Sequence, residues 1–153
     1  MPEQNRLRDE NAIYLNLIIK NIPGIIPIRR DERETLEAYY NFSFRYKKNK
    51  FKGLPINKFR AALTAELGIE VAASYIPLNK CSLYVPLTKP SRHKLSDDYW
   101  KAIDPSRFDL PVCDRIHFEE SACIHHKVLM GTKSEMDLIA NAISKVYDNA
   151  ESL

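Results

Sequence analysis

Glycine and cysteine are scarce in this sequence, and their scarcity argues against several kinds of site. Among the 153 residues there are only four glycines, and each is explained as the terminator of a helix or strand. A glycine-rich loop that wraps a phosphate group is therefore not predicted. The three cysteines, Cys81, Cys113 and Cys123, match neither a disulfide framework nor a Cys-x-x-Cys metal motif. We expect reduced thiols and no bound metal.

Long apolar runs and a strong charge of one sign are also missing. Every apolar stretch is interrupted within a few residues, and the first segment, MPEQNRLRDEN, is polar. Neither a membrane span nor a secretory leader is predicted, so we expect a cytoplasmic protein without a membrane partner. The formal net charge of +3 permits an anionic ligand but is too small to indicate a nucleic-acid partner.

Length and composition are typical of a single globular domain spanning residues 1–153, with 44% hydrophobic and 28% charged residues. Three segments have the spacing of amphipathic helices, namely residues 6–22, the segment that begins at Pro55, and the segment after Thr132. Shorter helices are expected after Ser96 and from Pro111.

The first of these helices has a broad apolar face, which we expect a second surface to cover. Its apolar positions are Leu7, Ala12, Tyr14, Leu15, Leu17, Ile18, Ile19 and Ile22.

Four segments have the composition or alternation of β-strands: residues 25–30, 40–46, 69–78 and 123–130. The alternation is strictest in the second, where Tyr40, Phe42, Phe44 and Tyr46 are predicted to be buried. Because strands and single helices follow one another, we predict an α+β fold. It consists of a small, mainly antiparallel sheet with helices packed on one side.

The segment from Tyr75 to Gly131 carries the most specific pattern in the chain. It reads YIPLNKCSLYVP, then LPVCDRIHFEES, then CIHHKVLMG. This order resembles the C-terminal small domain of the DegT/StrS group, which comprises pyridoxal-phosphate-dependent sugar and cyclitol aminotransferases. The resemblance runs from about Asn5 to Tyr147, and the large domain that holds the cofactor in that group is absent from the chain.

The resemblance implies part of an enzyme that aminates a keto-sugar or keto-cyclitol in polysaccharide or antibiotic biosynthesis, with glutamate or glutamine as amino donor. Pyridoxal phosphate is expected in the intact enzyme and not on this chain alone. None of its lysines follows the run of small polar residues that marks the family's catalytic lysine. We therefore expect no catalytic and no cofactor-binding residue here, and no transamination by the chain alone.

What the small domain supplies in such enzymes is a wall over the substrate. The candidate substrate-binding residues are Tyr75, Asn79, Lys80 and Tyr84, whose phenol, ammonium and amide groups suit a hydroxyl-rich molecule. Many relatives have a histidine where this chain has Asn79, a departure that resembles the branch acting on cyclitols. The alternative is that Asn79 bonds its own backbone in a turn and that the tyrosines belong to the core or its rim.

Three further pairs of residues could suggest a catalytic or metal site, but we do not favour that interpretation. Cys123 and His125 share a strand face, but no third group that would orient a nucleophile and base lies near in sequence. His125 and His126 are expected to leave opposite faces of a strand, one of them buried, which rules out joint metal binding. Glu119 and Glu120 are expected to form a solvated helix end.

The basic segment from Lys47 to Lys52 supports a different class of function. Cations interleaved with aromatic rings are typical of surfaces that bind single-stranded nucleic acid. We expect instead a solvated turn in which Tyr46 is buried and Phe51 anchors the chain. The alternative hypothesis is a stand-alone module that binds nucleic acid here or a protein through the opening helix.

For the aminotransferase hypothesis, the expected partners are the missing large domain or a separately encoded protein, together with a second copy in a homo-oligomer.

Overall fold

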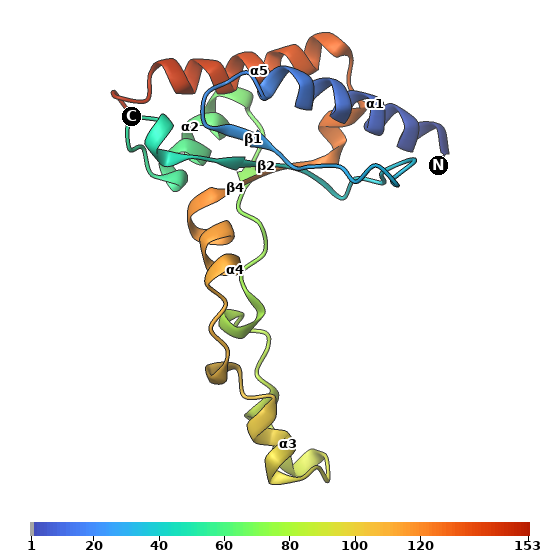
Figure 1. The fold of residues 1–153 in the computed structure, drawn as a ribbon, viewed down its shortest axis with the longest axis vertical. Helices are drawn as coiled ribbons and strands as arrows, with labels where there is room; N and C mark the ends of the chain where they lie inside the picture. Colours follow the sequence, from blue (N-terminus) through green and yellow to red (C-terminus); the bar gives the residue numbers. More distant parts are fainter. Residues whose placement is uncertain (1) are drawn as a thin grey trace.

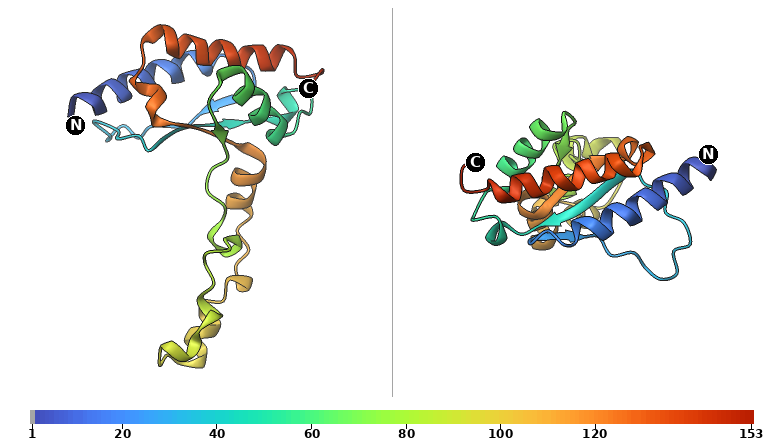
Figure 2. Two further views of the ribbon diagram at one scale, coloured as in Figure 1. Left: turned by 180° about the vertical axis from the view of Figure 1, so that it is seen from behind. Right: turned by 90° about the horizontal axis from the view of Figure 1, so that it is seen from above.

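The computed structural model describes residues 2–153, except for the side chain of residue 90, and its centre is an antiparallel sheet. The strands are β1 (Ile25–Pro27), β2 (Asn41–Tyr46), β3 (Val71–Ala72) and β4 (Ser121–His125), in the order β1-β2-β4-β3. The long helices α1 (Pro2–Ile19), α2 (Ile56–Leu67) and α5 (Lys133–Asp148) cover one face of the sheet (Figure 1, Figure 2). The predicted α+β architecture is confirmed.

Apolar and polar side chains alternate along β2, and the apolar ones pack between the sheet and the helices. Phe42, Phe44 and Tyr46 are buried beneath the helices, as predicted, whereas the residues between them face the other side. Tyr40 was predicted to continue this buried row, but it lies before β2 begins and is 66% exposed.

An aromatic cluster explains the basic turn that follows β2. The rings of Tyr46 and Phe51 lie 4.7 Å apart, and Phe59 of α2 lies 4.5 Å from Tyr46 and 5.2 Å from Phe51. The Tyr46 hydroxyl donates to the carbonyl of Leu54 at 2.6 Å, and burial raises the pKa of Tyr46 to about 12. Because both rings beside the lysines are buried, they are not available to stack on nucleic-acid bases.

The predicted signals at the ends of α2 and α5 are confirmed. Gly68 ends α2 in the left-handed conformation with φ 67°, which glycine adopts without a steric penalty. Thr132 and Glu135 form the capping box that begins α5. The buried stripe of α5 also contains the predicted residues, Met136, Ile139, Ile143 and Val146.

The predicted bounds of the opening helix are wrong. It spans Pro2–Ile19 rather than residues 6–22, and its fully buried apolar residues are Ala12, Leu15 and Ile19. Leu17 is 51% exposed. Since the sheet and α5 contact only one side of α1, the broad apolar face is only partly covered (Figure 2).

Two of the predicted strands are much shorter than expected. Of residues 69–78 only Val71–Ala72 pair with β4, and the predicted strand 123–130 ends at His125. His125 is opposite Asn41, the first residue of β2, so the chain beyond it has no partner and turns into the 3₁₀ helix His126–Met130. Within residues 2–153, none of the helices combines the length and the apolarity needed to cross a bilayer.

Residues 73–120 leave the sheet as a long arm of two limbs, on the side away from the helices (Figure 1). The arm contains α3 (Asp97–Ala102), α4 (Pro111–Arg115) and several single turns, and none of its described residues belongs to the hydrophobic core. The predicted helix starts are confirmed, because Ser96 Oγ accepts from the backbone of Tyr99 and Pro111 begins α4. The arm itself was not predicted.

Candidate functional site

The face of the sheet opposite the helices is polar and meets the root of the arm. On β2 it presents Asn41, Ser43 and Arg45, and on β4 the residues opposite these are His125, Cys123 and Ser121. Hydroxyl, amide and guanidinium groups on one surface suit a polar ligand that forms several hydrogen bonds. The alternation in β2 predicted Ser43 and Arg45 on this solvent-facing side, but neither was predicted as a site residue.

The carboxylate of Glu120 joins this face to the arm. It lies 2.7 Å from Nη2 of Arg45 on β2 and 2.9 Å from Nε of Arg115 on α4. The Glu120 side chain is 17% exposed, so the prediction of a solvated helix end is wrong for this residue. The triad keeps one positive charge in excess and fixes the arm to the sheet.

Asn79 and Lys80 hold the two limbs of the arm together. Lys80 Nζ is 2.7 Å from a carboxylate oxygen of Asp114 and 5.6 Å from the ring centre of Phe118. Asn79 Nδ2 donates to the carbonyl of Phe108 at 2.8 Å, on the other limb and not in its own turn. Its Oδ1 is buried and has no donor among the described residues.

The predicted tyrosines lie at different heights along the arm. Tyr75 stands at the root, 76% exposed, and a hydrogen bond with the side chain of Tyr40 is the main cause that raises the pKa of its hydroxyl. Tyr84 lies farther along the chain and is half-buried. The four candidate residues therefore follow one limb of the arm, and only Tyr75 is next to the polar face of the sheet.

Cys123 and His125 do not act on each other in this structure. The buried Cys123 thiol accepts a hydrogen bond from Ser43 Oγ at 3.3 Å, and His125 Nδ1 accepts from the backbone of Lys127 at 3.2 Å. Desolvation, then the nearby charges of His126 and Lys127, lower the pKa of His125. The prediction that the two histidines diverge is wrong, because β4 ends between them and their ring centres lie 4.2 Å apart; both remain at least partly exposed.

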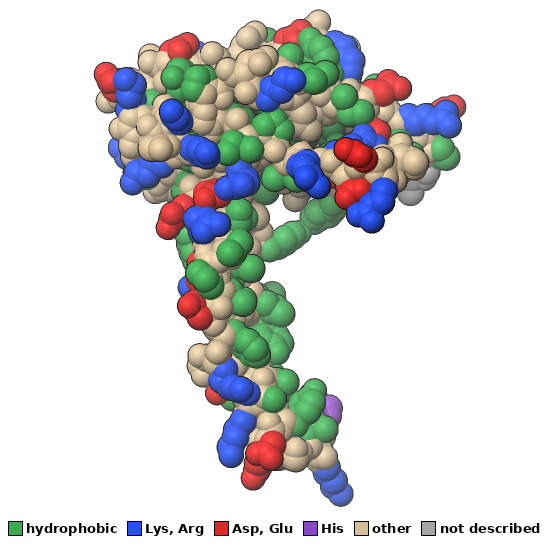
Figure 3. Space-filling model, viewed as in Figure 1, with side chains coloured by type: hydrophobic (Ala, Val, Ile, Leu, Met, Phe, Trp, Pro, Cys, Tyr) green, Lys and Arg blue, Asp and Glu red, His purple; other side chains and the backbone are tan. Residues whose placement is uncertain are grey.

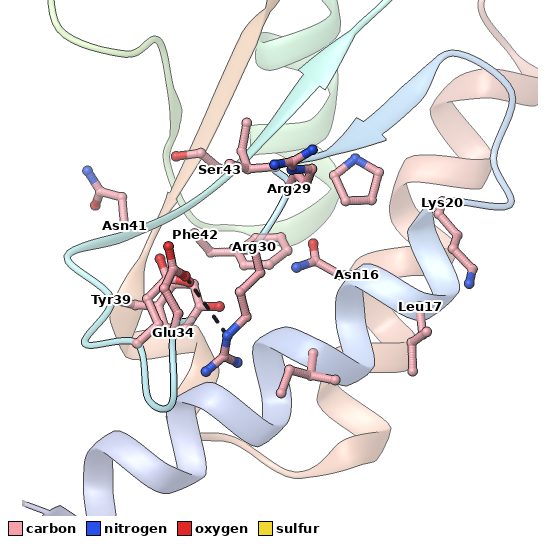
Figure 4. Close-up of a pocket in the computed structure, with 14 residues that line it drawn as sticks. Asn16, Leu17, Lys20, Arg29, Arg30, Glu34, Tyr39, Asn41, Phe42 and Ser43 are labelled. Atoms are coloured by element: carbon pink, nitrogen blue, oxygen red, sulfur yellow. Dashed lines mark ion pairs between the residues drawn. The ribbon is translucent and has the colours of Figure 1, made fainter. Parts of the chain in front are cut away.

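A groove of about 650 Å³ runs between α1 and the loop of residues 28–40 and ends at the same sheet edge (Figure 4). Ile13 and Leu17 of α1 line one side, and Ile28 lines the other. Asn16 points into it, and its Oδ1 is buried without a donor among the described residues. Arg30 crosses between the two sides and pairs with Asp9 at 2.8 Å.

Comparison with known proteins agrees with the resemblance inferred from the segment between Tyr75 and Gly131. The chain is 38% identical over 146 residues to the L-glutamine:2-deoxy-scyllo-inosose aminotransferase of Streptoalloteichus tenebrarius, covering 95% of this chain and 34% of that protein. It is 35% identical over 153 residues to the enzyme of the same name from Streptomyces fradiae, covering 100% of this chain and 35% of that protein. The chain thus spans about a third of the length of these relatives. The similarity extends over nearly the whole of this chain and over one part of each of these aminotransferases.

The fold of this small domain has a counterpart among solved structures. The crystal structure of 3-amino-5-hydroxybenzoic acid synthase matches it with a TM-score of 0.66 at 22% identity, over 97% of this chain and 35% of that one. No family model matches the chain. The match to the solved structure extends over nearly the whole chain, so the arm region falls within the compared length.

Among the described residues, the groove beside the basic turn does not fit pyridoxal phosphate. This second groove, between the basic turn and the arm root, contains Lys47 and Lys48 but also Glu119 and Glu120, whose carboxylates would repel the phosphate. Lys80 is held by Asp114. We therefore derive no step that passes through the cofactor on this chain.

Proposed function

We propose that this chain is the small domain of a pyridoxal-phosphate-dependent aminotransferase that aminates a keto-cyclitol, with glutamine as the donor. The observation that carries the proposal is the match, over 95% to 100% of the chain, to relatives named as L-glutamine:2-deoxy-scyllo-inosose aminotransferases. The cofactor and its lysine belong to a large domain, either elsewhere in a longer polypeptide or in a separate protein. The chain alone is inactive.

The small domain contributes a polar wall that closes over the substrate and excludes water. A cyclitol carries hydroxyl groups around its ring, which donate to and accept from amides, phenols and charged groups. Tyr75, Asn79, Lys80 and Tyr84 remain the proposed substrate contacts, and the open sheet face adds Ser43 to them. Tyr75 is the member of this set best placed for contact, because it is exposed beside that face.

A chimera tests this function. The matching third of the Streptomyces fradiae enzyme is replaced by this chain, and glutamine-dependent amination of 2-deoxy-scyllo-inosose is measured with pyridoxal phosphate present. We expect amination well above that of the same enzyme truncated before the replaced region, and none from the isolated chain. A chimera that folds and binds the cofactor but aminates no faster than the truncated control contradicts the proposal.

The wall itself is tested in the same chimera. Removing a hydroxyl that binds substrate costs about 1 kcal/mol, so Tyr75→Phe is expected to raise KM several-fold. Tyr99→Phe, near the tip of the arm, is the matched control. Equal kinetics for both variants would remove Tyr75 from the site.

A further inference from the structure

Two histidine rings lie next to each other on the surface where β4 ends. The ring centres of His125 and His126 are 4.2 Å apart, and the ring planes are 32° from parallel. His125 is exposed and His126 is half-buried. Among the described residues each ring makes one hydrogen bond, and in both rings Nδ1 makes it. The two Nε2 atoms are therefore available to another molecule.

The hydrogen bond of His126 determines which of its nitrogens carries the proton. Nδ1 lies 2.9 Å from the backbone carbonyl oxygen of Tyr40. Because a carbonyl oxygen only accepts hydrogen bonds, Nδ1 must donate, so in the neutral ring Nε2 carries no proton. His126 therefore offers a hydrogen-bond acceptor at Nε2.

The hydrogen bond of His125 has the opposite consequence. Its Nδ1 accepts from the backbone N–H of Lys127 at 3.2 Å, so the neutral ring carries its proton on Nε2. Desolvation, then the nearby charges of His126 and Lys127, lower the pKa of His125 and so favour the neutral ring. His125 therefore offers a hydrogen-bond donor beside the acceptor of His126.

The end of the strand explains why consecutive residues present their rings together. On a continued strand the two side chains would leave opposite faces, but β4 stops at His125 and the chain turns into the 3₁₀ helix His126–Met130. Asn41 on β2 is directly opposite His125, and side chains of directly opposed residues share one face of a sheet. The amide of Asn41 thus extends the polar surface beside the two rings.

Tyr40 connects this histidine pair to the proposed substrate wall. Its backbone carbonyl accepts from His126, and its side chain forms the hydrogen bond with Tyr75 described above. Tyr75 is exposed and is one of the proposed substrate contacts. A ligand that contacts Tyr75 is therefore brought close to the histidine pair.

A hydroxyl group fits the pair better than an ion does, because a hydroxyl both donates and accepts. An anion at this position would face the lone pair on Nε2 of His126, and a cation would face the proton on Nε2 of His125. A metal ion needs both Nε2 atoms unprotonated, so His125 would lose its bond from Lys127. Nowhere in the described chain do three His, Cys, Asp or Glu side chains come together as metal ligands.

We propose that His125 and His126 bind one ring hydroxyl of the substrate as a donor and acceptor pair. Nε2 of His125 donates to the hydroxyl oxygen, and Nε2 of His126 accepts from the same hydroxyl. The inference rests on the proposed function for the identity of the substrate, a keto-cyclitol, whereas both proton positions follow from this chain alone. A ring without a hydroxyl at this position leaves both groups unpaired, so the pair contributes to specificity.

The proton positions are tested first. Long-range proton–nitrogen NMR spectra of the histidine-labelled chain are recorded at about pH 8, where an ordinary imidazole is neutral. We expect His126 to carry its proton on Nδ1 and His125 to carry its proton on Nε2. The control is His93, which precedes α3 at the tip of the arm, away from the body (Figure 1, Figure 3). A proton on Nε2 of His126 overturns the proposal, because the acceptor is then absent.

Binding is tested by titrating the same chain with scyllo-inositol, a fully hydroxylated ring, while the histidine ring signals are followed. We expect saturable shifts at His125 and His126, none at His93, and none with cyclohexanone, which has no hydroxyl. Losing one hydrogen bond should raise the dissociation constant about fivefold in His125→Phe and in His126→Phe. His93→Phe should bind like the wild type, and His126→Gln, which keeps an acceptor, should lose less than His126→Phe. Circular dichroism confirms that each variant is folded.

Three results overturn the proposal. They are equal binding by all variants, no shift at the pair up to the solubility limit of scyllo-inositol, and binding of zinc at the pair without binding of the cyclitol. None of these measurements requires amination. A chimera that is active although the pair does not bind the cyclitol contradicts this inference alone, whereas a binding pair in an inactive chimera contradicts the proposed function alone.

Discussion

The carboxylate of Glu120 binds Arg45 across the boundary between the sheet and the arm, at 2.7 Å. The same carboxylate reaches Arg115 on α4 at 2.9 Å, so a single acidic group neutralises one of two neighbouring guanidinium groups and restrains the other. An exposed ion pair contributes little to stability, but here the Glu120 carboxylate is only 17% exposed and accepts charge-assisted hydrogen bonds from both partly exposed guanidinium groups. It determines how firmly the arm is attached.

Glu120→Gln is therefore expected to loosen the arm more than the body. The amide keeps the shape of the side chain but leaves two guanidinium groups without their counter-ion, at a cost of about 1 to 3 kcal/mol. We expect faster amide hydrogen exchange throughout residues 73–120 and a smaller change in α5. Glu119→Gln, one residue earlier and exposed without an ion pair among the described residues, is the control. Equal exchange in the two variants would show that the triad does not restrain the arm.

The capping box of α5 makes a separate prediction. Thr132→Ala removes the hydroxyl that accepts from the backbone of Glu135, and loss of an N-cap costs about 1 kcal/mol in the free energy of unfolding. Urea denaturation measures this loss, and Ser134→Ala, an exposed position in the first turn, should change stability by much less.

The box also predicts a pH dependence. Hydrogen bonds from the backbone and then the side chain of Thr132 lower the pKa of Glu135 in the folded state. The stabilisation is therefore present above the pKa of the unfolded chain and is lost as the pH falls through the lower, folded value. The difference in stability between wild type and Glu135→Gln should shrink in acid. A difference that stays constant down to strongly acidic pH contradicts this account.

The elements predicted correctly from the sequence are those whose burial is determined by residues close together in the chain. In β2 the alternation alone identified Phe42, Phe44 and Tyr46, because a half-buried strand places every second residue against the core. The capping residues of α2 and α5 could also be predicted from the sequence, because a cap is made by residues a few positions apart. The pattern between Tyr75 and Gly131 also pointed to the aminotransferases that the chain is similar to.

Elements that depend on distant partners could not be predicted in the same way. The lengths of β3 and β4 are set by where β2 begins and ends, not by their own composition, and both predicted strands were therefore too long. Asn79 and Lys80 looked like one turn facing a ligand, but their partners Phe108 and Asp114 are about thirty residues away. No periodic pattern in residues 73–120 reveals that the two limbs lie side by side.

The three cysteines differ in accessibility, which gives a prediction independent of any activity. Cys113 is exposed, Cys81 is half-buried, and Cys123 is buried beside Ser43. Iodoacetamide should therefore modify Cys113 first and Cys123 only after unfolding, because alkylation requires access to the thiolate. Mass spectrometry of peptides from the folded and the urea-unfolded chain measures the order. Rapid modification of Cys123 in the folded chain would place that thiol at the surface and contradict the fold around β4.

The hydroxyl of Tyr46 should control how the body responds to alkaline pH. Burial raises its pKa from 10.0 to about 12 in the folded state, so the neutral form is favoured there. Because the folded value is the higher one, the stabilisation is complete below pH 10 and is lost as the pH rises toward 12. Tyr46→Phe leaves the carbonyl of Leu54 without its donor and is expected to cost about 1 to 2 kcal/mol at neutral pH. Between pH 10 and 12 the variant should lose less stability than the wild type, as measured by urea denaturation across that range. Tyr99→Phe, at an exposed position on the arm, is the control and should follow the wild type at every pH. Parallel pH profiles of stability for the wild type and Tyr46→Phe would mean that another group causes the alkaline loss.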